Sequence, residues 1–195
     1  GERMYDEFRH LAAAVREAVR ATSLATPADL SAARSALLQG LVVGHGCRYV
    51  VDTDFGGGLA AVAWGTAVKR LPGGAAPRYV GVGRDPDLAR FAHTFLTRRG
   101  EFLAWARFVE VRVGAVAAAL ATIPDGRADL AVVHAPGAWA DAARDWDAAA
   151  RVVRPGGLLL LARGPAADPV PGGWAAARRA VPLDAGGCLL AAGEG

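Results

Sequence analysis

The segment from Tyr49 to Gly58 constrains the fold of this chain more than any other. It reads Tyr-Val-Val-Asp-Thr-Asp-Phe-Gly-Gly-Gly, so a short apolar stretch runs into a glycine-rich turn, and an apolar segment follows from Leu59. Glycine has no Cβ, so such a turn can adopt positive φ and approach a ligand closely, while the next helix presents unpaired backbone N–H groups. The pattern predicts a strand, a turn and a helix of an α/β protein, with a nucleotide-like ligand at the turn.

Length and composition limit the class of protein. A chain of 195 residues with 53% hydrophobic side chains is expected to form one globular domain with a full core. The longest apolar runs, such as Leu158–Ala162, are far shorter than the roughly 20 residues that span a bilayer. The first residues lead into a charged amphipathic segment instead of an apolar signal sequence, so we expect a cytoplasmic protein without membrane association.

Charge and cysteine content exclude two further classes. The net charge is only +3, and no run of five or more basic residues occurs, which argues against a nucleic-acid partner. Cys47 and Cys188 are too few for a disulfide framework or a zinc site. We expect both thiols to be buried and reduced.

The first 44 residues predict helices and the remainder predicts alternation. Met4–Ala21 carries apolar residues at spacings of three and four, which is typical of an amphipathic helix. A second helix is expected to begin at Thr26–Asp29 and to stop at Gly40. We therefore expect a helical segment, residues 1–44, packed on an α/β domain formed by residues 45–195.

Strand and helix candidates alternate through the second part. Such alternation implies parallel crossovers and a doubly wound sheet covered on both faces. The tail differs, because two short apolar stretches flank a turn-rich segment at 184–187 and predict an antiparallel closing hairpin. The expected strands are Tyr49–Thr53, Tyr79–Gly83, Phe108–Val113, Leu130–His134, Leu158–Ala162, Ala180–Leu183 and Cys188–Ala192, and the expected helices are Leu59–Leu71, Pro86–Arg99, Val116–Ile123 and Trp139–Val153.

Four motifs in order carry a resemblance to a family. They are the turn ending at Gly58, Val80–Pro86 after the second strand, Arg154–Gly157 before the fifth strand and the hairpin at Val181–Gly187. Over about residues 26 to 193 the chain resembles class I S-adenosylmethionine (SAM) dependent methyltransferases, and among them the small-molecule O-methyltransferases of the catechol and caffeoyl-CoA type. The resemblance implies a Rossmann-like, mostly parallel seven-stranded sheet with an antiparallel C-terminal strand, SAM as cofactor and a small-molecule substrate.

The resemblance also implies roles for individual residues. Asp52 matches the acid at the end of the first strand, and the cofactor-binding positions further include Gly56, Gly57, Gly58 and Gly83. Asp54 stands where the family has its first glycine, and its carboxylate would repel the carboxylate of the cofactor unless it is protonated or turned outward.

Two acids that contact the cofactor in the family are missing here. Gly83 replaces the acid that accepts the ribose hydroxyls, and Ala115 replaces the acid that reads the adenine amino group. Asp85 follows Gly83 closely, but Pro86 comes next, so we expect Asp85 to cap a helix.

The resemblance places His134 and Ala162-Arg163 where metal-dependent members have acidic and amide ligands, so we expect no magnesium site. His134 ends a buried strand at the edge where ligands bind in open α/β sheets, which makes it a candidate general base. We predict His134 and Asp54 as catalytic residues. Four tryptophans could line a pocket for a flat substrate or could belong to the core: Trp105, Trp139, Trp146 and Trp174. Trp139 is the best pocket candidate.

Metal-free O-methylation of a small molecule is the preferred function, and other interpretations stay open. Gly56–Ala61 also fits a dinucleotide fingerprint and Arg84 could suit a 2′-phosphate, as in an NADP-dependent reductase, although no Tyr-x-x-x-Lys pair is present. The fold could instead serve a repurposed enzyme that works without SAM, or a noncatalytic subunit of a partner enzyme. The apolar N-terminal helices further predict a homodimer, because in this family such segments often pack across a dimer.

Overall fold

The computed structural model describes residues 2–24, 30–184 and 187–194. Its contacts group the chain into two compact units, which are described separately. The first unit contains residues 1–48 and 55–114, and the second contains residues 49–54 and 115–195. The predicted division into 1–44 and 45–195 stays a prediction.

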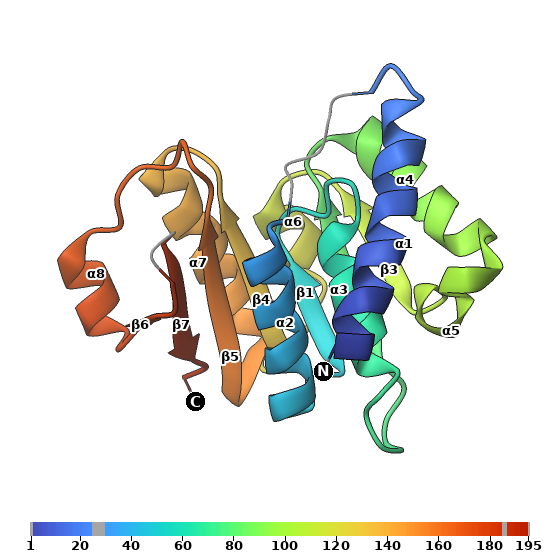
Figure 1. Ribbon diagram of the computed structural model, residues 1–195. Coiled ribbons are helices and arrows are strands. Elements are labelled where there is room, and N and C mark those ends of the chain that lie inside the picture. Colours follow the sequence, from blue (N-terminus) through green and yellow to red (C-terminus); the bar gives the residue numbers. More distant parts are fainter. Residues whose placement is uncertain (1, 25–29, 185–186, 195) are drawn as a thin grey trace. The chain divides into compact units, whose positions relative to one another are not determined.

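Helices dominate the first unit (Figure 1). Helices α1 and α2 both pack on α3, while α4 packs on α1 and on the two strands of the unit. The strands β2 and β3 are parallel, with Gly81 opposite Val111. The elements are α1 (Glu2–Arg20), α2 (Ala32–His45), α3 (Leu59–Val68), β2 (Arg78–Gly83), α4 (Pro86–Arg98), the short 3-10 helix η1 (Gly100–Phe102), α5 (Leu103–Ala106) and β3 (Val109–Val113).

The N-terminal helices follow the predicted pattern with one error. In α1 the buried side chains Phe8, Leu11, Val15 and Val19 recur at helical spacing, which confirms the amphipathic helix. The predicted start of α2 at 26–29 lies outside the described residues, and Ser31 caps the helix by accepting a hydrogen bond from the backbone N–H of Arg34.

The predicted end of α2 at Gly40 is wrong. The helix continues to His45 because Leu38, Leu41 and Val42 keep one face buried across the glycine. It ends at Gly46, whose φ of +64° belongs to the left-handed region that glycine adopts without strain.

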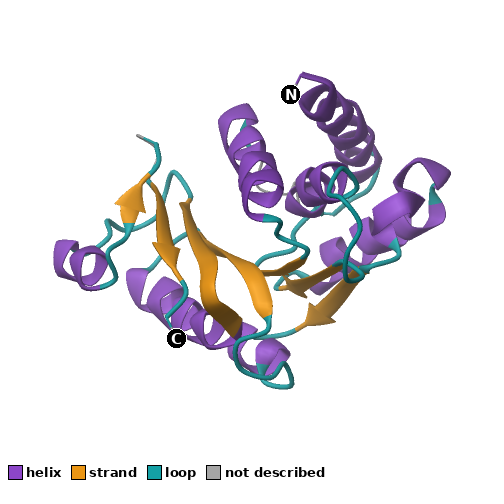
Figure 2. Cartoon of the chain, turned by 90° about the horizontal axis from the view of Figure 1, so that it is seen from below, coloured by secondary structure: helices purple, strands orange, loops and turns teal. Residues whose placement is uncertain are grey.

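The second unit holds most of the sheet. The strands β1, β4 and β5 are parallel neighbours, and β7 pairs antiparallel with both β5 and β6. Helix α7 packs on β4 and β5, and helices lie along the strands when the chain is seen from below (Figure 2). The elements are β1 (Tyr49–Asp52), α6 (Val116–Leu120), β4 (Ala128–Ala135), α7 (Trp139–Val152), β5 (Val153–Arg163), α8 (Gly172–Ala177), β6 (Val181–Pro182) and β7 (Cys188–Ala192).

Strand β5 begins earlier than predicted. The pairs Ala128↔Val153 and Leu130↔Leu158 enclose an irregularity in the ladder with β4, so the expected turn Arg154–Gly157 is a bulge within a longer strand. Gly156 has a φ of +76° at this point. The closing hairpin is present, with Asp184 accepting a hydrogen bond from the backbone N–H of Cys188, while residues 185 and 186 of its turn lie outside the described residues.

Among the described residues the sheet has seven strands in the order β3-β2-β1-β4-β5-β7-β6. The predicted fold class, a mostly parallel Rossmann-like sheet with an antiparallel C-terminal hairpin strand, is confirmed. Cys47 and Cys188 are both buried and unbridged, as expected. No helix in the described parts of the chain is long and apolar enough to cross a membrane.

Candidate functional site

The carboxyl ends of β1 and β4 bring Asp52 and His134 together. The two strands are parallel with Asp52 opposite Val132, so the end of β1 lies beside His134. Asp52 Oδ1 is 2.8 Å from His134 Nε2; the Asp52 side chain is fully buried, whereas 23% of the His134 side chain is exposed. The contact is within salt-bridge distance, and it becomes an ion pair when the imidazole accepts a proton.

Thr53 fixes the backbone around this pair. Its side-chain oxygen accepts a hydrogen bond of 2.9 Å from the backbone N–H of His134, and its own N–H donates to the carbonyl of Val132. Thr53 is fully buried. Sequence reasoning missed this role, because Thr53 and His134 are 81 residues apart and only the strand register joins them.

Asp52 also orders the start of the glycine-rich turn. Its Oδ1 accepts a hydrogen bond of 3.0 Å from the backbone N–H of Asp54, and the Asp54 side chain is half-buried. One buried carboxylate therefore contacts both predicted catalytic residues, His134 through its ring and Asp54 through its backbone. The family resemblance implied a cofactor-binding role alone for Asp52, and the structure adds its contact with His134.

A histidine beside a buried carboxylate can serve as a base. The carboxylate orients the imidazole ring and stabilises the positive charge that forms when the ring accepts a proton. The partial exposure of His134 gives a substrate hydroxyl a route to the ring. The arrangement is thus suited to removing a proton from a bound nucleophile.

The glycine-rich turn of the first unit has the predicted backbone geometry. Gly56 and Gly58 have φ values of +52° and +82°, and α3 begins directly after Gly58. A Cβ at Gly58 would lie 3.2 Å from Leu96 and 3.3 Å from Phe55, so a side chain there would be both strained and crowded. Positive φ at both glycines and the crowding at Gly58 explain why the turn is built from residues without a Cβ.

Gly83, at the end of β2, does not offer the family's contact to the ribose. A Cβ built on Gly83 would lie 2.7 Å from the Cβ of Ala89 in α4, so the backbone is packed too tightly for a side chain. Asp85 accepts a hydrogen bond of 3.3 Å from the backbone N–H of Leu88 and caps α4, as predicted. Ala115, where the family has the adenine-reading acid, has only a methyl side chain.

At its carboxyl end, β5 carries Arg163 where the family resemblance implies metal ligands in metal-dependent members. Ala162 lies opposite His134, and the next residue is Arg163. The Arg163 guanidinium donates hydrogen bonds to the carbonyls of Ala167 and Asp168, at 2.7 and 3.0 Å. Across the described ranges no group of three or more His, Cys, Asp or Glu side chains could hold a metal ion.

The tryptophans lie in both units, and each is buried or half-buried. Trp105 is buried in the first unit. In the second unit the rings of Trp139 and Trp146 each meet the ring of Trp174 edge to face, with centroids 4.8 Å apart. Trp139 is half-buried, and its backbone N–H donates to Asp168. Its role as a substrate wall stays a prediction.

Comparisons with known proteins identify the fold. No family model and no curated protein sequence matches the chain. Among solved structures, the cofactor-bound Rv0187 from MTB superposes with a TM-score of 0.63 at 25% identity, covering 77% of this chain and 63% of that one. The O-methyltransferase TomG from Streptomyces achromogenes, in complex with SAM, gives 0.60 at 22% identity over 76% and 63% of the two chains.

A third neighbour agrees with these two. The O-methyltransferase from Bacillus cereus, in complex with SAH, gives a TM-score of 0.59 at 19% identity and covers 83% of this chain and 66% of its own. The chain thus spans less than two thirds of the length of all three neighbours. It has the fold of the class I SAM-dependent O-methyltransferases, as the motifs predicted.

Proposed function

We propose that this chain is a SAM-dependent methyltransferase that methylates a hydroxyl group of a small molecule without a metal ion. The observation that carries the proposal is the contact between buried Asp52 and partly exposed His134 at the carboxyl ends of two parallel strands. The fold supports it, since neighbours with the same fold are O-methyltransferases with SAM or SAH bound. A base supplied by the protein makes a metal unnecessary for activating the hydroxyl.

The backbone of Gly56–Gly58 would hold the cofactor. The positive φ angles of Gly56 and Gly58 open the turn, and α3 provides a helix N-terminus. Gly83 would contribute backbone only, so the ribose would lack the carboxylate partner that the family supplies. When bound, SAM supplies an electrophilic methyl group on a positively charged sulfur.

His134 would remove the proton of the acceptor hydroxyl, and Asp52 would orient the ring and stabilise its charge. Thr53 would hold the His134 backbone through the hydrogen bond to its N–H. The other contribution of the protein is to align the hydroxyl oxygen with the methyl group for an in-line displacement. Asp54 is the second predicted catalytic residue.

Calorimetry and a transfer assay test the proposal in two stages. We expect SAM and SAH to bind the purified protein with micromolar Kd, and labelled methyl groups to pass from SAM to one or more members of a panel of phenols and other hydroxyl acceptors. His134→Ala is expected to lower kcat by about 10²- to 10⁴-fold, the usual contribution of a general base, with the Kd for SAM unchanged. Unchanged turnover of His134→Ala would remove the assigned base.

Asp52→Asn probes the partner of the base. We expect it to lower kcat and to displace the acid limb of the pH–rate profile, because an amide cannot stabilise the charged imidazole as a carboxylate does. Glu110→Gln, an exposed substitution on β3, serves as a matched control and should leave both quantities unaltered.

One observation favours a second function. Gly83 packs so closely against Ala89 that a side chain at position 83 has no room. A single substitution of Gly83 would therefore not supply the carboxylate that the family uses to bind the ribose. A methyltransferase-like protein that no longer transfers methyl groups, either repurposed or acting as a partner subunit, would have this feature. Absence of SAM and SAH binding at millimolar concentration would favour that function. A cytoplasmic location and self-association through the N-terminal helices are further parts of the proposal.

A further inference from the structure

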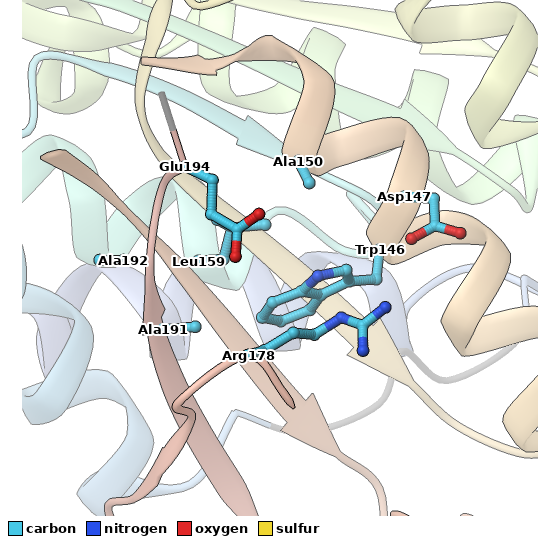
Figure 3. Close-up of a pocket in the computed structure, with 8 residues that line it drawn as sticks. All are labelled: Trp146, Asp147, Ala150, Leu159, Arg178, Ala191, Ala192 and Glu194. Carbon is cyan, nitrogen blue, oxygen red and sulfur yellow. The ribbon is translucent and has the colours of Figure 1, made fainter. Parts of the chain in front are cut away.

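A cavity of about 230 Å³ opens in the second unit (Figure 3), and neither Asp52 nor His134 is among its lining residues. Its apolar lining comes from Leu159 of β5 and from small side chains of α7 and β7. The other lining residues are an aromatic side chain and three charged ones, Trp146, Asp147, Arg178 and Glu194. Such a mixture of apolar surface and a few polar groups is typical of sites for small molecules.

Trp146 provides a rigid aromatic wall. Only 3% of the residue is exposed, and its ring packs edge to face on Trp174 at a centroid distance of 4.8 Å. Within the described ranges its indole N–H makes no hydrogen bond, and the nitrogen is not among the buried unsatisfied atoms, so the donor is open to solvent. A ligand in the cavity could therefore use both the ring and a free donor.

The charged residues of the cavity have no salt bridge to any other described residue. The Arg178 guanidinium stacks on Trp174 at 4.4 Å and donates one hydrogen bond of 3.2 Å to the carbonyl of the same residue, which leaves most of its N–H donors unused. Counting only described residues, neither Arg178 nor the carboxylates of Asp147 and Glu194 form a salt bridge. In the view of Figure 3 the Trp146 ring lies between Glu194 and Arg178.

We propose that this cavity binds a small zwitterion of the α-amino acid type. The ligand carboxylate would pair with Arg178, the ammonium group with Glu194, and the side chain would lie against Trp146. An anion alone would face two carboxylates, and a simple amine would leave Arg178 without a partner. The volume is below the roughly 300 Å³ at which pockets for drug-sized ligands begin, which suits a single amino acid.

Calorimetric titration with L-phenylalanine, L-leucine and L-methionine tests the site. At least one of these amino acids is expected to bind saturably. Compounds that lack one charged group, such as phenethylamine and 3-phenylpropionate for phenylalanine, should have a Kd at least about tenfold higher, because a charged hydrogen bond is lost.

Variants locate the binding. Arg178→Gln and Glu194→Gln should each raise the Kd of the amino acid about tenfold, with an unchanged far-UV circular dichroism spectrum. Arg144→Gln is the matched control, because Arg144 is an exposed arginine of α7 whose only described ion pair is with Asp141 on the same helix, and it should have no effect.

Three results would overturn the proposal. The first is that none of the three amino acids binds saturably at concentrations up to about 10 mM, tenfold above the Kd of a weak ligand. The second is that Arg178→Gln and Glu194→Gln bind the amino acid as tightly as the wild type. The third is that SAH competes with the amino acid. The last matters because SAH itself carries an amino acid group, so competition would assign the binding to the proposed cofactor site. The first two outcomes leave the proposed methyl transfer untouched.

Discussion

Substitution of Gly83 by alanine tests the packing of the end of β2 against α4. The new Cβ would lie 2.7 Å from the Cβ of Ala89, about 1 Å closer than a comfortable carbon–carbon contact. Ala89 is fully buried and its Cβ is fixed to the backbone of α4, so the helix must shift to make room. Overpacking of this kind costs about 1–3 kcal/mol, and the reduced entropy of the unfolded chain offsets about 0.5–1 kcal/mol. We expect a net loss of about 1–2 kcal/mol in the free energy of unfolding.

Urea denaturation followed by circular dichroism measures this loss. Two further variants test whether the loss comes from the contact between residue 83 and Ala89. Gly40→Ala is the control, since Gly40 lies within α2 with no atom near its added Cβ, and it should raise stability by about 0.5–1 kcal/mol. Ala89→Gly should restore room for a side chain at Gly83, so the double variant should be about 1–2 kcal/mol more stable than the sum of the single changes predicts. A Gly83→Ala protein as stable as Gly40→Ala would refute the reasoning.

The same packing bears on cofactor binding. Gly83→Asp would introduce the carboxylate that the family uses for the ribose, yet the clash with Ala89 displaces the local backbone. We therefore expect no gain in SAM affinity from Gly83→Asp alone, and a gain only when Ala89→Gly accompanies it. Calorimetric titration of both variants distinguishes this steric account from simple loss of an acid, for which the single substitution would be sufficient.

Two further predictions concern stability in the first unit. Burial alone would raise the pKa of Glu7, but hydrogen bonds and charge interactions with Lys69 and Arg70 outweigh it and hold the pKa below its ordinary value of 4.5. The stabilisation from Glu7, about 1 kcal/mol or less for such a partly exposed ion pair, is therefore present above pH 4.5 and lost as the pH falls through the lower folded pKa. Wild type and Glu7→Gln should differ in urea midpoint at pH 7 and converge at acid pH. Gly65→Ala should lower stability by about 3 kcal/mol in the same assay, because the added Cβ would overlap the buried ring of Trp105, and a loss below about 1 kcal/mol would contradict the packing of α3 on that ring.

Local patterns were enough for most secondary structure. The expected strands and helices depend on apolar spacing and on glycine or proline boundaries. The periodicity of α1, the turn before α3 and the cap at Asp85 all appear as predicted. The errors fall where packing overrides a local signal. Gly40 does not end α2, because apolar residues beyond it keep the helix buried, and Arg154–Gly157 does not interrupt β5, because the ladder with β4 absorbs it as a bulge.

The candidate site shows the same division. The sequence by itself determined the glycine-rich turn and put His134 at a strand end, since both are features of short segments. Only the tertiary structure decided that Asp52 contacts His134, that Thr53 holds its backbone and that Gly83 has no room for a side chain. Each of these depends on the register of parallel strands or the packing of a helix on a strand. Such contacts join residues far apart in the chain, and no local pattern encodes the distance between them.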